Sequence, residues 1–194
     1  MVLAAGGSQR LGRPKQLLTR DGETLVHRAV RLAAATHPRR LLVVLGAHEE
    51  TIRTQLGDLD CEVVSNSDWS EGLAGSLRLA AMQLRDNICP VLILGCDQPA
   101  LEAAHLQQLL QGAAQAHSRC AATWHRDAPG IPVVASAELF AAAAQLHGDR
   151  GLGAHLAQLP AGSLSLLDAP SLSLDIDTAE DLRAAIDRGL CDPA

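Results

Sequence analysis

A glycine-rich segment near the N-terminus carries the residue types best suited to holding phosphate groups. The segment, LAAGGSQRLGRPK at positions 3–15, begins within a short apolar run. Glycine leaves backbone N–H groups free to turn toward a ligand, and successive N–H groups form a nest that binds anions. The segment matches neither GxxxxGK followed by Ser or Thr, nor GxGxxG. We interpret it as a phosphate cradle of another kind, the alternative being an ordinary Gly/Ser turn with solvated charges.

Lys15 stands out within this segment because it is the only lysine among the 16 Lys and Arg residues of the chain. An ammonium group is a compact point charge, whereas a guanidinium group is a planar fork. Because every other cation of the chain is an arginine, the lysine at position 15 predicts that a point charge is needed there.

Three aspartates are candidates for holding a metal ion. Asp97 comes soon after the apolar run 91–95, and Asp175 and Asp177 precede the last helical pattern. Proteins bind Mg²⁺ through one or two carboxylates together with substrate phosphates. We expect Asp97 and Asp177 to hold Mg²⁺, with Asp175 as the alternative to Asp177. The competing interpretations are that Asp97 is a turn residue and that Asp177 is the N-terminal cap of a helix.

Short apolar runs alternate with stretches of helical period, which is the pattern of strand–helix units around a mainly parallel sheet. The expected strands are Val2–Ala5, Leu41–Leu45, Cys61–Val64, Val91–Gly95 and Ala121–Trp124. The expected helices are Thr24–Ala35, Glu49–Leu56, Ser76–Leu84, Glu102–Ala116, Ala137–Leu146, Leu152–Leu159 and Thr178–Arg188. His125–Gly130 is expected to be a polar loop. We predict an α/β fold with three layers, α/β/α, in a single domain over residues 1–194.

The segments that follow strands are the candidates for the site, because open parallel sheets bind ligands outside the carboxyl ends of their strands. These segments are 6–15, 65–76 and 96–99. The glycine-rich segment and Asp97 both belong to them.

Composition excludes several classes of function. The formal net charge is −6, whereas binding to nucleic acids or anionic membranes is dominated by clustered Lys and Arg. The sequence starts MVLAAGG, without the basic and long apolar regions of a signal peptide, and no apolar run reaches the ~18 residues of a membrane span. The five cysteines contain no CxxC pair, which argues against a zinc site or a disulfide framework. We expect a cytoplasmic protein that binds neither nucleic acid nor membranes.

Five motifs, in this order, resemble the signatures of the molybdenum cofactor cytidylyltransferases within the nucleotidyltransferase superfamily. The first is positions 3–18, in which Pro14-Lys15 followed by Gln-Leu-Leu is similar to the cytidylyl rather than the guanylyl relatives. The others are Asn66 with Gly72 and Ser76-Leu77-Arg78, Gly95–Pro99, Gly148–Gly151 and Asp175–Leu182.

The resemblance implies a Rossmann-like nucleotidyltransferase fold with a short antiparallel element near the acceptor site. It implies the transfer of CMP from CTP to molybdenum-bound molybdopterin, with release of pyrophosphate and with Mg²⁺ on Asp97 and Asp177. It also implies a molybdenum hydroxylase as the partner that would receive the product. The implied catalytic residues are Arg10, Lys15 and Asp97. The implied nucleotide-binding residues are Leu3, Ala4, Ala5, Gly6, Gly7, Ser8, Asn66, Gly72 and Ser76. The implied acceptor-binding residues are Gln98, Pro99, Ile131 and Arg150.

Individual roles follow from the same resemblance. The segment 6–8 would hold the β- and γ-phosphates, which Arg10 would neutralise, and Lys15 would stabilise charge at the α-phosphoryl group. Independently of the resemblance, the residue pattern predicts that Ser76 caps a helix that begins with Leu77.

Two departures from the family pattern leave other functions open. Ile131 stands where the family has histidine in a GHP motif, and Ala179 replaces a proline. One alternative is a cytidylyl- or guanylyltransferase that acts on another phosphorylated acceptor, such as a sugar phosphate. Another is a protein that binds the molybdenum cofactor without making it. A third is a nicotinamide-dependent oxidoreductase, which would need an acidic residue at the end of its second strand, where this chain has Leu45-Gly46-Ala47.

Overall fold

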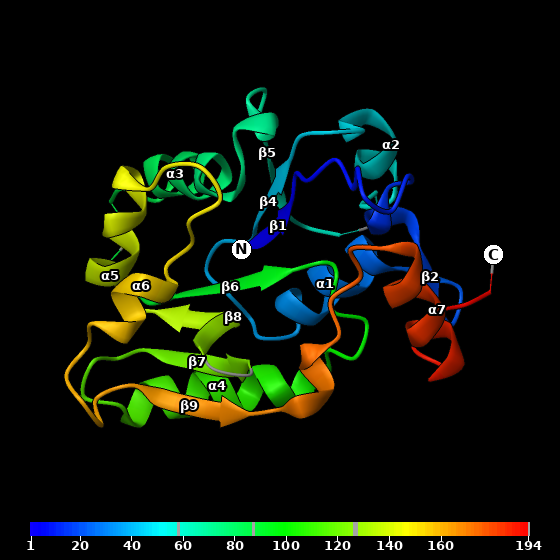
Figure 1. Ribbon diagram of the computed structural model, residues 1–194. Helices are drawn as coiled ribbons and strands as arrows, with labels where there is room; N and C mark the ends of the chain where they lie inside the picture. The colour runs from blue at the N-terminus through cyan, green and yellow to red at the C-terminus, as the bar shows by residue number, and fades with distance from the viewer. Residues whose placement is uncertain (58, 87, 126–127, 194) are drawn as a thin grey trace.

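The computed structural model describes residues 1–57, 59–86, 88–125 and 128–193. Within these ranges the main sheet has seven strands in the order β5-β4-β1-β6-β8-β7-β9 (Figure 1). The strands are β1 Val2–Ala4, β4 Leu42–Leu45, β5 Glu62–Ser65, β6 Val91–Gly95, β7 Ala121–His125, β8 Ala128–Ala135 and β9 Ser165–Asp168. Among these described strands only β8 runs antiparallel to its neighbours. The predicted mainly parallel α/β sheet is confirmed.

The position of β1 explains why its sequence is short and apolar. It pairs in parallel with β4 on one edge and with β6 on the other, so its backbone groups are satisfied on both sides. Val2 and Ala4 are buried against one layer of helices, and Leu3 packs against the other. Because β1, β4, β5 and β6 are parallel, the segments that follow them lie at one edge of the sheet.

Helices cover both faces of the sheet, as predicted. One core cluster joins the sheet to α3 Leu73–Gln83, α5 Ala137–Ala141 and α6 Gly153–Ala157. On the opposite face lie α1 Leu25–Ala34, α2 Glu49–Thr54 and α4 Ala103–Gln115. The fold therefore has the three layers expected from the sequence. Single turns of 3₁₀-helix complete the chain at η1 Lys15–Leu17, η2 Trp69–Glu71, η3 Ala142–Gln145 and η4 Pro170–Ser173.

The C-terminal helix returns to the N-terminal part of the chain. Helix α7 Ala179–Asp187 lies beside the small hairpin of β2 Thr19–Arg20 and β3 Glu23–Thr24 (Figure 1). Its Leu182 shares a small core with Leu25 and Ile176. Asp192 accepts hydrogen bonds from the backbone N–H groups of Asp21 and Gly22, both at 2.9 Å. These contacts fix the segment before α7 next to the glycine-rich segment.

Three local predictions were wrong. The expected loop His125–Gly130 instead contains the end of β7 and the start of β8, while residues 126–127 lie outside the described part of the chain. Its Pro and Gly residues favour a turn locally, but β8 gains ladder hydrogen bonds from β6 and β7 on both sides. Helix α3 begins at Leu73 rather than near Ser76. The pattern 137–146 is divided into α5 and η3.

No helix that the structure describes is long and apolar enough to cross a membrane. The five cysteines are free, and Cys96, Cys120 and Cys191 are buried. Burial, together with the nearby charge of Asp97, raises the pKa of the Cys96 thiol to about 12.

Candidate active site

A buried glutamine holds the glycine-rich segment against the end of β1. The side chain of Gln16 is 0% exposed, and its Nε2 donates to the carbonyl oxygens of Ala4 at 2.9 Å and Gly6 at 2.7 Å. Ser8 Oγ accepts a hydrogen bond from the backbone N–H of Lys15 at 3.1 Å. Gln16 thereby holds the start of the glycine-rich segment, and Ser8 is bound to the backbone at its end. Sequence reasoning did not single out Gln16, although a polar residue between Lys15 and two leucines was a signal for it.

Four charged side chains from three separate segments meet at the carboxyl edge of the sheet. Lys15 Nζ lies 2.8 Å from Asp97 Oδ2 and 2.9 Å from Asp177 Oδ1. Arg10 Nη2 lies 2.9 Å from Asp177 Oδ2. The backbone N–H of Ile176 donates to the carbonyl oxygen of Asp97 at 2.9 Å, which fixes Asp177 beside the end of β6. We call Arg10, Lys15, Asp97 and Asp177 the charged cluster.

Lys15 is the electrostatic centre of the charged cluster. Burial alone would lower the pKa of Lys15, but the carboxylates of Asp97 and Asp177 outweigh burial and raise it. Burial would likewise raise the pKa of Asp177, yet the hydrogen bond and charge of Lys15, with the charge of Arg10, lower it. Both shifts favour the charged forms of Lys15 and Asp177. The two carboxylates of the charged cluster thus pair with two cations, the ammonium group of Lys15 and the guanidinium group of Arg10.

The two rival aspartates before α7 have different surroundings. Asp177 contacts both cations of the charged cluster. The carboxyl group of Asp175 is partly dehydrated and lies near the charge of Asp97, and both effects raise its pKa to about 6 although the residue is exposed on the surface. Asp177 is not the cap of α7, because Thr178 Oγ1 accepts the hydrogen bond from the N–H of Asp181 at 3.2 Å. The capping interpretation of Asp177 was wrong.

One oxygen of the charged cluster lacks a partner. Asp97 Oδ1 is buried and accepts no hydrogen bond from the described residues, an arrangement that costs free energy unless another group is bound. The described residues contain no group of three or more His, Cys, Asp and Glu side chains arranged to hold a metal ion. Mg²⁺ needs no such cage, because it keeps several waters and is bound through one or two carboxylates plus phosphate oxygens. The unpaired Oδ1 and the adjacent Asp177 fit a divalent cation of this kind.

The predicted base and ribose residues form a second group beside the glycine-rich segment. Asn66 Nδ2 donates to Ser76 Oγ at 3.0 Å, and both side chains are buried. Asn66 Oδ1 accepts the N–H of Asp68 at 3.1 Å. Ser76 therefore does not cap α3, which begins three residues earlier. It lies in the first turn of α3 and fixes the segment that follows β5.

Two glycines are explained by close contacts. Gly72 has φ 98°, and a Cβ there would collide with Asp149 and would lie 2.8 Å from the carbonyl oxygen of Gly148. A Cβ on Gly7 would lie 2.6 Å from Cζ3 of Trp69. The indole ring of Trp69 thus packs against the glycine-rich segment. Sequence reasoning missed Trp69, for which no motif gave a signal.

The four predicted acceptor residues do not gather at one point. Gln98 is buried, and its Nε2 donates to the carbonyl oxygens of Ile131 at 3.1 Å and Leu172 at 3.2 Å. The carbonyl oxygen of buried Pro99 accepts from Arg20 at 2.7 Å. Arg150 is exposed, while Ile131 lines an apolar cavity. Gln98 therefore holds the backbone of two neighbouring segments, Pro99 binds the side chain of Arg20, and Ile131 lines the apolar cavity.

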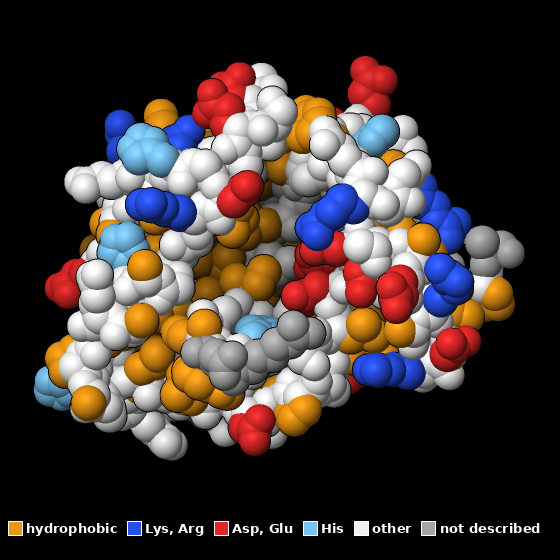
Figure 2. All heavy atoms as spheres, viewed as in Figure 1, with side chains coloured by type: hydrophobic (Ala, Val, Ile, Leu, Met, Phe, Trp, Pro, Cys, Tyr) orange, Lys and Arg blue, Asp and Glu red, His pale blue; other side chains and the backbone are white. Residues whose placement is uncertain are grey.

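The apolar cavity lies between the sheet, α3 and α6, and has a volume of about 220 Å³. Figure 2 shows it as a hollow with hydrophobic side chains on its floor, and with acidic side chains and a basic side chain along one rim. The lining residues are Leu3, Leu73, Leu77, Ile93, Pro129, Gly130, Ile131, Val133, Gly151, Leu152, Gly153 and Leu156.

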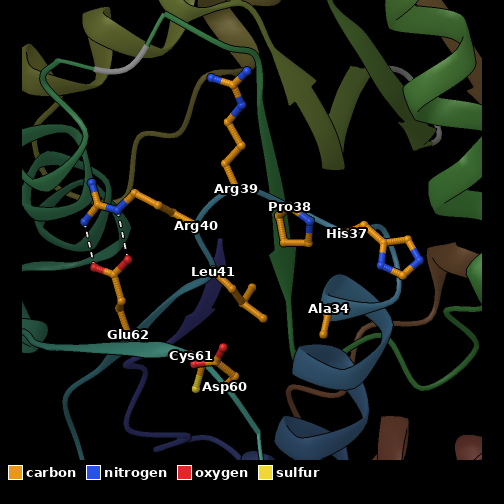
Figure 3. Close-up of a pocket in the computed structure, with 9 residues that line it drawn as sticks. All are labelled: Ala34, His37, Pro38, Arg39, Arg40, Leu41, Asp60, Cys61 and Glu62. Carbon is orange, nitrogen blue, oxygen red and sulfur yellow. Dashed lines mark hydrogen bonds and ion pairs between the residues drawn. The ribbon is translucent and has the colours of Figure 1, made fainter.

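A larger hollow, of about 500 Å³, lies at the opposite edge of the sheet, where β4 and β5 begin. Figure 3 shows that Arg40 and Glu62 pair across one side of it, with His37 and Pro38 on another. Ligands of open parallel sheets bind at the carboxyl ends of strands, and this hollow is at the amino ends. We place the candidate active site at the charged cluster.

Comparison with known protein families gives the class of protein that this fold and site define. The chain matches the MobA-like NTP transferase domain over residues 1–163. It therefore belongs to the MobA-like NTP transferase family, and its predicted place in the nucleotidyltransferase superfamily is confirmed.

Three similar proteins or structures, with different names, match nearly the whole chain. Nicotine blue oxidoreductase of Paenarthrobacter nicotinovorans is 32% identical over 193 residues, which cover 94% of this chain and 93% of that protein. The crystal structure of Rv0371c from Mycobacterium tuberculosis is 28% identical, covers 96% of both chains and has a TM-score of 0.76. A structure of Rv0371c in complex with manganese is aligned at 25% identity, again over 96% of both chains with a TM-score of 0.76.

Proposed function

We propose that this protein is a metal-dependent nucleotidyltransferase that transfers CMP from CTP to a phosphorylated acceptor. The observation that carries the proposal is the contact of Lys15 with both Asp97 and Asp177 beside the glycine-rich segment. Nucleotidyl transfer depends on positioning and on electrostatic stabilisation, and these residues supply a cation, carboxylates and an anion-binding loop. The family match supports a nucleoside triphosphate as one substrate.

In the proposed reaction an oxygen of the acceptor phosphate attacks the α-phosphorus of CTP. A new P–O bond forms there, and the bond from the α-phosphorus to pyrophosphate breaks. Backbone N–H groups of the segment 6–8 would bind the β- and γ-phosphates. Arg10, at the exposed rim, would neutralise their charge, and Lys15 would stabilise the charge that develops around the α-phosphorus. No nucleophilic side chain is required.

The metal ion would be held by Asp97 and Asp177. When bound, it would screen the repulsion between the two anionic substrates. The unpaired Oδ1 of Asp97 supports this assignment, and the manganese complex of Rv0371c supports the use of a divalent cation in this family. We propose Mg²⁺ as the ion, and Asp177 rather than Asp175 as the second ligand, because Asp177 contacts both cations of the charged cluster.

The base and ribose of CTP would lie against the group formed by Asn66, Gly72 and Ser76 and the backbone of residues 3–5. The buried hydrogen bond between Asn66 and Ser76 gives this side a fixed shape. The indole of Trp69 would form a wall between this side and the phosphate-binding segment, since it leans on Gly7.

Molybdenum-bound molybdopterin is the acceptor that the sequence motifs favour. Its phosphate would be the attacking group, and the molybdopterin cytosine dinucleotide would be the product. A molybdenum hydroxylase in the cytoplasm would receive that product. Gln98 would contribute to acceptor binding indirectly, by holding the backbone of Ile131.

The test is a panel of CTP, GTP, ATP and UTP with purified molybdenum cofactor as acceptor and with pyrophosphate release as the readout. We expect CTP to give the highest rate, and we expect chelation of divalent cations to abolish it. An acceptor-free reaction and the Lys15→Ala variant are the controls. Absence of pyrophosphate release with every nucleotide would refute the proposal.

A second candidate function is supported by one observation. The relative named nicotine blue oxidoreductase matches over nearly the full length of both chains. An oxidoreductase that uses NADH or NADPH would need a ribose-binding acidic residue after β4, where the chain has Leu45, Gly46 and Ala47. Spectrophotometric oxidation of NADH and NADPH in the presence of nicotine blue separates the two functions, because the transferase should show none.

A further inference from the structure

Cations of the protein already contact both carboxylates that would hold a metal ion. Lys15 Nζ lies 2.8 Å from Asp97 Oδ2 and 2.9 Å from Asp177 Oδ1. The other oxygen of Asp177, Oδ2, lies 2.9 Å from Arg10 Nη2, whereas Asp97 Oδ1 has no partner among the described residues. A metal ion that binds Asp177 therefore meets an oxygen that is already paired with a side chain of the protein.

Lys15 is the cation that bridges the two carboxylates. Its Nζ contacts an oxygen of Asp97 and an oxygen of Asp177, and its side chain is 15% exposed. The side chain of Arg10 is 72% exposed, so solvent screens its charge more strongly. A divalent cation on the same oxygens would lie close to the ammonium group of Lys15, and like charges repel strongly where solvent is partly excluded. Lys15 and a metal ion thus compete for Asp97 and Asp177.

The surroundings of Lys15 hold its backbone in place but leave its side chain able to move. The backbone N–H of Lys15 donates to Ser8 Oγ at 3.1 Å. The next residue, Gln16, is buried and holds the backbone of the same segment. Lysine carries its ammonium group on a flexible aliphatic stem. Because Ser8 belongs to the segment proposed to bind phosphates, rotation of this stem is enough to carry the charge from the carboxylates to a bound triphosphate.

We propose that Lys15 takes the place of the metal ion in the free protein, and that binding of a divalent cation to Asp97 and Asp177 releases Lys15 toward the nucleotide. This inference rests on the proposed function, in which Lys15 stabilises charge at the α-phosphoryl group. Before the metal ion binds, the ammonium group neutralises the two carboxylates and holds them in position. After the metal ion binds, the same ammonium group is free to contact the substrate. The charge needed for the reaction therefore becomes available only when the metal ion is in place.

The first experiment measures the binding of Mn²⁺ alone, without nucleotide, by calorimetry and electron paramagnetic resonance. Lys15→Met removes the charge and keeps the approximate length of the side chain. We expect this variant to bind Mn²⁺ at least about tenfold more tightly than the parent, because a competing cation is lost. Lys15→Gln is a second neutral variant and should also bind Mn²⁺ more tightly. Lys15→Arg keeps the charge and should keep the weaker affinity of the parent.

Two arginines of the glycine-rich segment provide matched controls. Arg10→Ala removes an exposed cation that contacts Asp177, and it should tighten Mn²⁺ binding less than Lys15→Met does. Arg13→Ala removes another exposed cation of the segment, and it should leave the affinity unchanged. Thermal unfolding of each variant verifies that the fold is retained. Affinities of Lys15→Met and Lys15→Gln that equal or fall below that of the parent, or absence of Mn²⁺ binding in every variant, would overturn the exchange.

The second experiment uses the unaltered protein, because Lys15 is the only lysine of the chain. Its acylation by an amine-reactive ester is followed by mass spectrometry of the peptide that contains it. We expect Mg²⁺ to increase the acylation rate several-fold, since Lys15 leaves its two ion pairs, and we expect CTP added with Mg²⁺ to lower the rate again. Free N-acetyl-lysine in the same solution is the control for the reagent. An acylation rate that Mg²⁺ leaves unchanged would also overturn the exchange.

Pyrophosphate release is measured on the same preparations, so that the two proposals can fail separately. Tighter Mn²⁺ binding by Lys15→Met, without turnover of CTP by the parent, would refute the transferase and keep the exchange. Turnover of CTP by the parent, with the Mn²⁺ affinity unaltered in both neutral variants, would keep the transferase and refute the exchange.

Discussion

The charged cluster and the apolar cavity meet at Gly95, where a Cβ would contact both Asp97 and Ile131, yet they differ in almost every physical property. The charged cluster joins side chains as far apart in the sequence as Arg10 and Asp177 through contacts of 2.8–2.9 Å. Among the residues that the structure describes, the cavity is lined by aliphatic side chains, a proline and glycines, and none of these lining side chains is charged. In the charged cluster, electrostatic interactions fix the geometry in advance of binding. In the cavity, only shape and the exclusion of water can discriminate among ligands.

This difference implies that substitutions in the charged cluster and in the apolar cavity should have different kinds of effect. Loss of one charge leaves a partner uncompensated in a partly buried place, so effects on the reaction should be large. Loss of one methyl group from the cavity changes contact area by a small amount, so effects on acceptor choice should be graded. The predictions below run in order of decreasing effect, from the charged cluster and the glutamine that supports it to a carboxylate outside both regions.

Removal of the central ammonium group should have the largest effect. Lys15→Ala should reduce turnover by at least ~100-fold, on the scale of losing one preorganised electrostatic donor. Steady-state kinetics of pyrophosphate release measure this. Arg13→Ala, which removes an exposed cation from the same segment, should change turnover by less than about threefold. Near-normal turnover of Lys15→Ala would remove Lys15 from the mechanism.

Removal of the buried Gln16 side chain, which holds the glycine-rich segment, should destabilise the fold without changing any charge. Gln16→Ala takes away the donor to the carbonyl oxygens of Ala4 and Gly6. We expect the free energy of unfolding in urea to fall by about 2 kcal/mol, the cost of leaving buried polar groups unpaired. Gln9→Ala, at an exposed position of the same segment, is the control and should change it by less than about 0.5 kcal/mol. Equal stability of the two variants would mean that Gln16 does not hold the segment.

Neutralisation of one carboxylate should weaken nucleotide binding only when a metal ion is present. Asp97→Asn should raise the Kd of CTP by about tenfold or more with Mg²⁺ and should change it little with a chelator. Calorimetry in the two buffers gives the comparison. The same substitution at Asp175 should have a smaller effect, because Asp177 is the proposed second ligand. A loss of affinity that is identical in both buffers would point to misfolding rather than to metal binding.

The smallest expected effect is a pH dependence of stability that comes from Glu23, which lies outside both the charged cluster and the apolar cavity. Hydrogen bonds from Arg31, with a contribution from His27, outweigh burial and lower the pKa of Glu23 from 4.5 to about 2. A lowered carboxyl pKa stabilises the fold above pH 4.5, and this stabilisation is lost as the pH falls toward 2.

Glu23→Gln should therefore lower the free energy of unfolding by about 1 kcal/mol at pH 7, since Glu23 is partly exposed. The difference from the parent should vanish near pH 2. Chemical unfolding at several pH values measures it, with Glu50→Gln at an exposed site as the control. A difference that persists unchanged at pH 2 would show that the charge of Glu23 is not its cause.

The polar half of the candidate site could be predicted because its residue types are informative by themselves. A glycine-rich segment, a lone lysine and an aspartate after a buried strand indicate phosphate chemistry wherever they occur together. The choice between Asp175 and Asp177 was beyond the sequence, since both precede α7 by a few residues. Their different environments follow from the hydrogen bond between Ile176 and Asp97, which is a long-range contact.

Apart from Ile131, which the family motif singled out, the lining of the apolar cavity could not be predicted from the sequence. Leu3, Leu77 and Ile93 have the same residue types as the core, so nothing in their pattern distinguishes the wall of a cavity from filled interior. Strand β8 was mistaken for a loop in part because Pro and Gly residues disfavour strands locally, whereas pairing with β6 and β7 stabilises it.

The sequence by itself determined the alternation of strands and helices, the mainly parallel sheet and the membership of a nucleotidyltransferase family, because periodicity and short motifs are local properties. Only the tertiary structure decided which aspartate meets Lys15, how Gln16 and Trp69 support the glycine-rich segment, and that Ile131 lines an apolar cavity. Those features depend on distances between residues that are remote in the chain, and such distances are fixed by packing rather than by local propensity.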